Sequence, residues 1–460
     1  MDSEKLGFTK REKLYWSSAS IPSALTYQMF SAYIFYFYET VLNPGLPPID
    51  VAIGLVIWSI WNAINDPLLG YISDHTKTKE GRRIPYIKYG TIPFVIIFLL
   101  VWTPPSADLT VVFIYYLTMI LLFDGLYTMV ILGWTSLFPE MYKTHKERVE
   151  VTGIRQFFTL FGAILAYVVP TFLPNVDPVP WIIVGSIFAV ISGFFLFLSL
   201  KGSREDLTYQ DEGALGFKET FTVSLTNKSF LTFVFTHLCI QYGQTLLTSA
   251  YPYYRDYALK IQPENLLGGL ILLLVFVFAI ISIPLWGKLG QKFGNRKCWI
   301  LGLIISIFSL QIFWFPVPLA LLVLVLPLGV GIMSQLFFMD NIIADIVDED
   351  ELKTGVRRES TYFGMNAFVM RLAVAIQALT LGITLQLTKG IELVLSIPGN
   401  TIRLVLTGTA DFWITFIMAI PTAIALCIGI LIMKYYPLHG EYLVEVKKKV
   451  KELHEKKGTE

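Results

Sequence analysis

Long apolar segments alternate with short polar ones along almost the whole chain. A helix of about 20 apolar residues crosses the roughly 30 Å hydrocarbon core of a bilayer, and the pattern predicts twelve such helices. They cover approximately residues 14–42, 48–72, 88–104, 109–136, 150–172, 179–200, 228–256, 265–287, 297–316, 318–341, 359–388 and 409–435. Pro and Gly recur inside these segments, which is typical of membrane helices.

The spacing of the polar segments divides the helices into two groups of six. The longest polar connection lies between the sixth and seventh predicted helices. We therefore predict an all-α integral membrane protein with an N-terminal bundle (1–200), a connecting loop (201–227), a C-terminal bundle (228–436) and a basic tail (437–460). The tail has apolar residues at helical spacing, which predicts a short basic helix lying either on anionic lipid or in water.

The loops alternate in their content of Lys and Arg. One set is rich in both residues, and the other set is nearly free of them: Asn43–Asp50, Thr103–Leu109, Phe172–Pro180 and Phe315–Pro318. Basic loops stay in the cytoplasm, so we predict a multi-pass protein of the plasma membrane with both termini in the cytoplasm.

Composition then excludes several classes of protein. Of the 460 residues, 54% are hydrophobic and 15% charged, with a mean hydropathy of +0.60, whereas soluble proteins carry about 25% charged residues. The net charge of +1 leaves no electrostatic footprint for nucleic acid. The three cysteines and five histidines have no metal-site spacing, and no nucleophile motif is present. We expect no structural metal, no cofactor and no enzymatic activity.

The chemistry of the chain centres on an acid within the second apolar segment. Asp66 lies in a run that otherwise reads as membrane-buried, where a carboxylate is costly and marks a functional site by default. Asn62 is four residues earlier and shares its helix face, and Asn65 is adjacent. These oxygens suit a monovalent cation or a proton. The alternative is that Asp66 caps or pairs with a group near the helix end.

A gapped motif extends from this acid into the next loop. It comprises Asn65, Asp66, Pro67, Gly70, Asp74, Thr76, Thr78, Gly81, Arg82, Arg83 and Pro85. The motif resembles the helix 2 to helix 3 signature of the major facilitator superfamily and, more narrowly, of the glycoside–pentoside–hexuronide:cation symporters. The resemblance implies the major facilitator fold, with a cavity between the two bundles near the midplane. It also implies secondary active transport of a small glycoside-like solute by alternating access, coupled to Na⁺ or H⁺, in a protein that we expect to be a monomer.

The resemblance assigns a cation site and a gate. In that family the position of Asn62 is an acid, Asp66 matches the second acid, and Thr128 matches a hydroxyl that also coordinates the cation. Loss of one acid predicts weaker sodium binding, or Asp66 working as a lone proton carrier. The gating residues would be Asp74, Gly81, Arg82 and Arg83, unless the two arginines only fix topology. A weak echo of this turn follows the eighth predicted helix, with Gly294 at the matching glycine.

Two arginines are candidate solute contacts. Arg155 matches a family arginine that contacts the sugar, although an arginine near the interface also snorkels. Arg371 lies about twelve residues into the eleventh predicted helix, roughly 18 Å along it, at the position of a family lysine. Asp66 is its candidate partner, either as a coupling pair that the cation competes for or as a static pair.

The sugar pocket itself departs from the family pattern. Ser23 stands where the principal sugar-binding acid is expected, and Ile131 replaces another acid. Trp134 is adjacent to the position of the sugar-stacking tryptophan. Asp124 precedes Ile131 by two helical turns and is a candidate displaced contact to the solute, with Tyr27 as a further lining residue.

These departures keep a second transport hypothesis open. A less polar pocket with Arg371 facing a phosphate would suit a lysolipid or another amphipathic solute, carried by a symporter of the same fold. Asp66, Arg371 and the organisation in two halves argue against a channel or scaffold. A polar solute predicts a wet cavity, whereas a lipid predicts an opening between helices.

Overall fold

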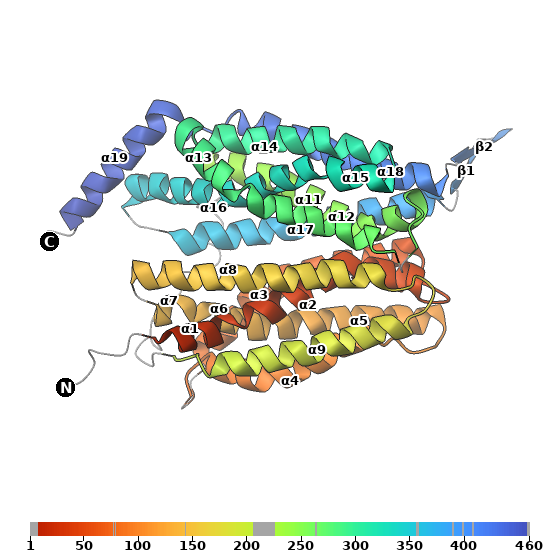
Figure 1. Cartoon of the computed structure of the whole chain (residues 1–460), viewed down its shortest axis with the longest axis horizontal. Coiled ribbons are helices and arrows are strands. Elements are labelled where there is room, and N and C mark those ends of the chain that lie inside the picture. The colour runs from red at the N-terminus through yellow and green to blue at the C-terminus, as the bar shows by residue number, and fades with distance from the viewer. Residues whose placement is uncertain are drawn as a thin grey trace. The chain divides into compact units, whose positions relative to one another are not determined.

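The computed structural model describes residues 8–205 and 226–457, apart from 77, 79, 143, 263–264, 356–357, 389–390, 398–399 and 407–408. The chain divides into two compact units, Met1–Gly213 and Ala214–Glu460. Most of the predicted connecting loop, 206–225, lies outside the described residues. Each unit is a bundle of helices (Figure 1).

The first unit contains nine α-helices, two π-helical turns and one 3₁₀ turn in its described part. They are α1 (Lys10–Ser17), α2 (Ser20–Tyr36), η1 (Phe37–Val41), α3 (Pro48–His75), α4 (Ile84–Val101), α5 (Leu109–Tyr127), η2 (Thr128–Leu132), α6 (Gly133–Ser136), α7 (Phe138–Met141), α8 (His145–Val168), η3 (Val169–Phe172) and α9 (Val179–Leu200). Helix α3 packs against α5, and this pairing positions the acid of the motif. The Tyr116 hydroxyl of α5 donates to the carbonyl of Val51 of α3 at 3.0 Å, which ties the two helices together.

The second unit begins with a long helix and ends with a short amphipathic one. Its elements are α11 (Lys228–Tyr253), η5 (Tyr254–Ala258), α12 (Leu267–Ile281), α13 (Ile283–Phe293), α14 (Asn295–Leu310), η6 (Gln311–Trp314), α15 (Pro318–Leu324), α16 (Leu326–Thr354), α17 (Glu359–Thr388), β1 (Ile391–Ile397), β2 (Asn400–Leu406), α18 (Ala410–Met433) and α19 (Gly440–Lys457). Helix α11 packs on α17 and α18, and α14 packs on α16.

The second unit, helical as predicted, also contains two short strands between α17 and α18. They form an antiparallel hairpin in which Ile391 lies opposite Leu406 and Ile397 opposite Asn400. The hairpin extends away from the helices of its unit (Figure 1). It falls between the eleventh and twelfth predicted spans, in a segment where only a loop was expected.

Fewer helices than predicted are plainly apolar enough to cross a membrane. In the described part of the chain, nine helices are long and apolar enough, and a tenth span results if α12 and α13, which are bent by 43°, count as one. The predicted first and seventh spans correspond to α2 with η1 and to α11, which do not meet this test. Some of their hydroxyl groups bond within the helix, as where Thr26 donates to the carbonyl of Pro22 at 2.7 Å and Thr236 to that of Thr232 at 2.8 Å.

The two units repeat each other in local geometry. Helices α2 and α11 both end in a π-helical turn. The turn after α3 contains Gly81 at φ +109°, and the turn after α13 contains Gly294 at φ +83°. Only glycine adopts such angles without strain, so the weak sequence echo at Gly294 corresponds to a repeated backbone conformation.

Candidate functional site

A buried polar cluster lies between α3 and α5. Asn62 and Asn65 of α3 are 2% and 0% exposed, Asp124 of α5 is 1% exposed, and Asp66 is half-buried. The side-chain amides of Asn62 and Asn65 donate to the two carboxylate oxygens of Asp124, one to each. The same carboxylate therefore binds two residues that are three apart on one helix face.

Thr128 joins this cluster from the next turn along the chain. It begins the π-helical turn η2, where its hydroxyl donates to Oδ1 of Asp66 at 2.9 Å. Single π-helical turns inside membrane helices are frequent at functional sites. We call Asn62, Asn65, Asp66, Asp124 and Thr128 the polar cluster.

The polar cluster brings together all four residues predicted to bind the coupling cation. It also contains Asp124, which was predicted to contact the solute. Two atoms within it have no hydrogen-bond partner, namely the amide carbonyl oxygens of Asn62 and Asn65. An unpaired buried polar atom costs about 1–3 kcal/mol. The donor set consists of oxygen atoms, which suits a hard cation or a proton rather than a soft metal.

Ser23 and Tyr27, both predicted to line the solute site, contact Tyr127, which was not predicted to belong to it. The hydroxyl groups of Ser23 and Tyr127 lie 3.1 Å apart, and the rings of Tyr27 and Tyr127 lie 5.3 Å apart. Tyr127 directly precedes Thr128 of the polar cluster. The sequence alone could not predict this role of Tyr127, because the residues that it contacts lie on α2, far from it in the chain.

Arg155 and Trp134 contact each other, and their predicted contact with the solute stays a prediction. The Arg155 guanidinium lies over the rings of Trp134, Trp16 and Phe138, at 4.8, 5.4 and 5.4 Å. Trp134 is 1% exposed, and its indole N–H donates to the carbonyl of Trp16 at 3.0 Å. These contacts are cation–π interactions within an aromatic cage, and they tie α8 to α1 and α6.

One ring of this cage lies outside the membrane helices. The Tyr142 ring lies 5.3 Å from that of Trp16. Burial raises the pKa of the Tyr142 phenol above its usual value of about 10. The phenol is therefore neutral at pH 7 and presents no charge to Arg155.

Arg371 belongs to the second unit. It lies on α17 and is half-buried. Its predicted pair with Asp66 would join the two units, and it stays a prediction.

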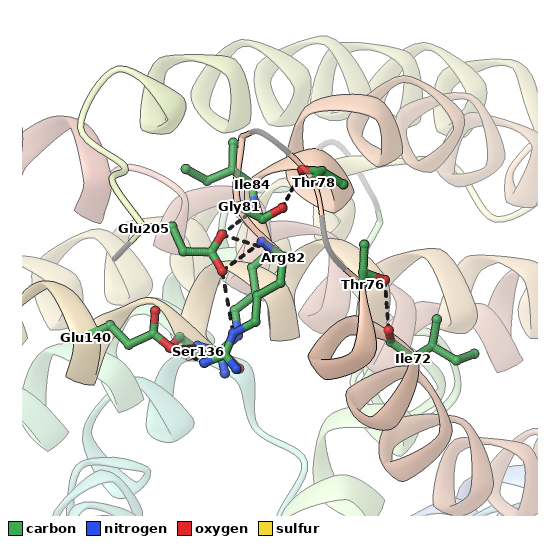
Figure 2. A network of polar contacts seen from close by, with 10 residues as sticks. Ile72, Thr76, Thr78, Gly81, Arg82, Ile84, Ser136, Glu140 and Glu205 are labelled. Atoms are coloured by element: carbon green, nitrogen blue, oxygen red, sulfur yellow. Dashed lines mark hydrogen bonds and ion pairs between the residues drawn. The ribbon is translucent and has the colours of Figure 1, made fainter. Parts of the chain in front are cut away.

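Arg82 and Arg83 form ion pairs within the first unit. Both guanidinium groups contact Oε1 of Glu140 at 2.6 Å, and Arg83 also donates to the carbonyl of Ser136 at 2.5 Å. Figure 2 shows that these groups converge on the turn after α3. Both roles of the two arginines, the gate and the fixing of topology, stay predictions. The side chain of Asp74, the fourth predicted gating residue, lies outside the described residues.

A second carboxylate closes the same turn. Glu205 follows α9, and its carboxylate accepts the backbone N–H groups of Arg82, Arg83 and Ile84 at 3.0, 2.8 and 3.2 Å (Figure 2). These are the free N–H groups at the start of α4, where the helix dipole also favours an anion. The Glu205 side chain is 1% exposed. The sequence analysis did not identify Glu140 and Glu205 as partners of the motif, since both are distant from it in sequence.

Comparison with known proteins gives the class of this fold. The sequence profile of MFS/sugar transport proteins matches residues 15–440. The chain is 25% identical to the isoprimeverose transporter of Lactiplantibacillus pentosus, over 81% of this chain and 79% of that protein. It is 21% identical to the sodium-dependent lysophosphatidylcholine symporter 1-A of Danio rerio, over 94% of this chain and 87% of that protein. The crystal structure of a D-xylose–proton symporter matches with a TM-score of 0.66 at 14% identity, over 94% of this chain and 98% of that one.

The fold and the profile together define a membrane transporter, not an enzyme. The chain belongs to the MFS/sugar transport protein family. The major facilitator fold predicted from the motif is thereby confirmed.

The turn after α3 supplies a test of its own. A Cβ added to Gly81 would lie 2.3 Å from Oε2 of Glu205, whereas one added to Gly294 would meet no atom within 4 Å. Both positions have a positive φ, so Gly294→Ala carries only the backbone strain of about 1–3 kcal/mol. We expect Gly81→Ala to lower the thermal unfolding midpoint of the purified protein more than Gly294→Ala. Equal shifts would show that Glu205 leaves the turn at little cost.

Proposed function

We propose that this protein is a sodium-coupled symporter that moves a small sugar-like solute across the plasma membrane by alternating access. The polar cluster is the observation that carries the proposal. It combines two carboxylates with two buried amide oxygens that have no hydrogen-bond partner. A cation bound there would satisfy atoms that the protein itself leaves unpaired.

The number of oxygen atoms supports Na⁺ over H⁺. A proton needs one carboxylate, and the amide oxygens of Asn62 and Asn65 would then gain nothing. Na⁺ is coordinated in transporters by carbonyl and carboxylate oxygens, which Asn62, Asn65, Asp66, Asp124 and Thr128 provide. Burial of two carboxylates without a cation is expensive, so occupancy by Na⁺ would also stabilise the fold.

Asp124 changes the expected strength of the site. With Asn62 in place of the family's acid, the sequence predicted a loss of one negative charge. Asp124 supplies a second carboxylate from α5 and holds the amides of Asn62 and Asn65. We infer that Asp124 serves the cation rather than the solute, and that sodium binding does not suffer the predicted weakening.

The solute would be recognised by neutral groups next to the cation. Ser23, Tyr27 and Tyr127 offer hydroxyl groups and aromatic faces, and sugar rings pack their apolar faces against such rings. The likeness to the isoprimeverose transporter supports a glycoside as the solute. A lysolipid is the second candidate, favoured by the likeness to the lysophosphatidylcholine symporter, with Arg371 as the headgroup contact.

The arrangement in the membrane follows the charge of the loops. We place both termini in the cytoplasm, with the turn after α3 and the helix α19 on that side. The gate would comprise Arg82 and Arg83 with Glu140 and Glu205 as their partners. A monomer is sufficient, because each proposed ligand of the cation comes from one chain.

The first test measures cation binding by thermal stability. A ligand at a hundredfold excess over its dissociation constant stabilises the folded state by about 2.7 kcal/mol. We expect Na⁺, at constant ionic strength against choline, to raise the unfolding midpoint of the wild type. In Asp124→Asn the Na⁺ concentration for half-maximal stabilisation should rise at least tenfold, because the second carboxylate is lost.

A matched control lies on the same helix. Asp50 is in the first turn of α3 and outside the polar cluster, so Asp50→Asn should keep the wild-type response to Na⁺. An unchanged Na⁺ response in Asp124→Asn would remove Asp124 from the cation site. Stabilisation by acid in place of Na⁺ would favour a proton.

The second test separates coupling from binding. We expect Asp66→Asn to abolish uptake of solute driven by a sodium gradient in proteoliposomes, because the variant cannot carry the cation with the solute. Wild-type vesicles with the gradient dissipated by an ionophore are the control. Full gradient-driven uptake by Asp66→Asn would refute the coupling role of this residue.

The third test identifies the solute class. Isoprimeverose, other small glycosides and lysophosphatidylcholine are each added to the thermal assay with and without Na⁺. We expect a glycoside to stabilise the wild type and Tyr127→Phe to weaken that effect, since the variant keeps the ring and loses the hydroxyl. Stabilisation by lysophosphatidylcholine alone would transfer the protein to the second candidate function.

A further inference from the structure

The C-terminal end of α16 is unusually acidic for a buried helix end. Asp345, Glu349, Asp350 and Glu351 are 4%, 3%, 5% and 2% exposed. Carboxylates near a helix C-terminus oppose the helix dipole, and burial raises their cost. Lys353 of α16 itself lies 2.6 Å from Oε1 of Glu349, and the amide of Asn295 donates to Oδ2 of Asp345 at 3.2 Å. Further partners come from the tail helix.

Helix α19 supplies two of these partners. Nζ of Lys447 lies 2.9 Å from Oδ1 of Asp345, and the Tyr442 hydroxyl donates to Oε1 of Glu349 at 2.9 Å. Val446 and Val450 of α19 are 4% and 7% exposed. These two valines of the predicted apolar stripe therefore pack against the protein, whereas Val444 is 68% exposed. The surroundings of the outer face, lipid or water, stay a prediction.

The docking of α19 is incomplete. Oε2 of Glu349 and Oδ2 of Asp350 are buried and have no hydrogen-bond partner. A buried polar atom without a partner is unfavourable, so these two carboxylates are only partly satisfied while α19 is docked. The ion pair is also accessible to solvent, since the Lys447 side chain is 54% exposed. The docked helix is therefore held by a small balance of contacts.

The position of α19 in the chain suits a movable element. It begins at Gly440, whose φ is +60°. The residues just before it are anchored, with Tyr436 and Leu438 each 1% exposed. The acidic end of α16 leads through Gly355, at φ +75°, into α17, which carries Arg371. A contact on this end of α16 acts on the corner between α16 and α17.

We propose that α19 is a latch, docked through Lys447 on Asp345, that restrains the corner between α16 and α17. Release of the latch exposes the acidic end of α16 to water and frees the corner to move. The consequence for transport rests on the proposed function, because a freed corner would speed the conformational step of a symporter. The restraint itself is a property of the second unit and is measured without any solute.

Hydrogen–deuterium exchange of the full-length protein in nanodiscs tests the latch. Lys447→Glu places a carboxylate against Asp345 and should release α19. Lys448→Glu changes the charge by the same amount at an exposed neighbour and is the matched control. We expect amide exchange to rise at least tenfold in Lys447→Glu, both over residues 442–453 and over residues 345–355, and to stay at the wild-type rate in Lys448→Glu.

A second variant removes the helix without adding a charge. A chain that ends at His439 should show the same faster exchange over residues 345–355. The latch is refuted if α19 exchanges faster in Lys447→Glu while residues 345–355 keep the wild-type rate, because α19 is then an appended helix only. It is also refuted if both charge variants behave alike. Neither result depends on whether the solute of the proposed symporter has been found.

Discussion

A carboxylate that is buried in a membrane protein must be matched by donors or by a cation, and this constraint organises the first unit. Asp124 is met by the amides of Asn62 and Asn65, and Asp66 by the hydroxyl of Thr128. The amides satisfy the carboxylate, and their own carbonyl oxygens are left without hydrogen-bond partners. The packing of α3 on α5 thus leaves two buried amide oxygens unpaired, and these are the atoms that the proposed cation would bind.

The same constraint is met in two opposite ways at helix ends. Glu205 lies at the N-terminal end of α4, where three backbone N–H groups and the helix dipole favour a carboxylate. The acids of α16 lie at a C-terminal end, where the dipole disfavours them, and they recruit Lys447 and Tyr442 from α19. The first arrangement uses backbone groups of the helix that the carboxylate caps, whereas the second relies partly on α19, beside Lys353 and Asn295. This difference is the reason to place a latch in the second unit.

Much of the fold was predictable because membrane helices leave a strong signal in one sequence. A run of about 20 apolar residues is needed to cross the bilayer whatever the helix packs against. The signal was weakest for α2 and α11, where hydroxyl groups such as those of Thr26 and Thr236 bond to carbonyls of their own helix and so tolerate burial. The hairpin of β1 and β2 was not predicted, because no minimum length of apolar sequence marks a short strand as it marks a membrane helix.

The sequence by itself determined the transporter class and the residues that share the face of α3, since helical spacing alone places Asn62 beside Asp66. Only the tertiary structure decided that Asp124 joins them, because its partners lie 59 and 62 residues away on another helix. The same applies to Glu205, to the aromatic cage around Arg155 and to the docking of α19. Such pairings depend on how helices pack, and helical periodicity carries no information about which distant polar groups will meet.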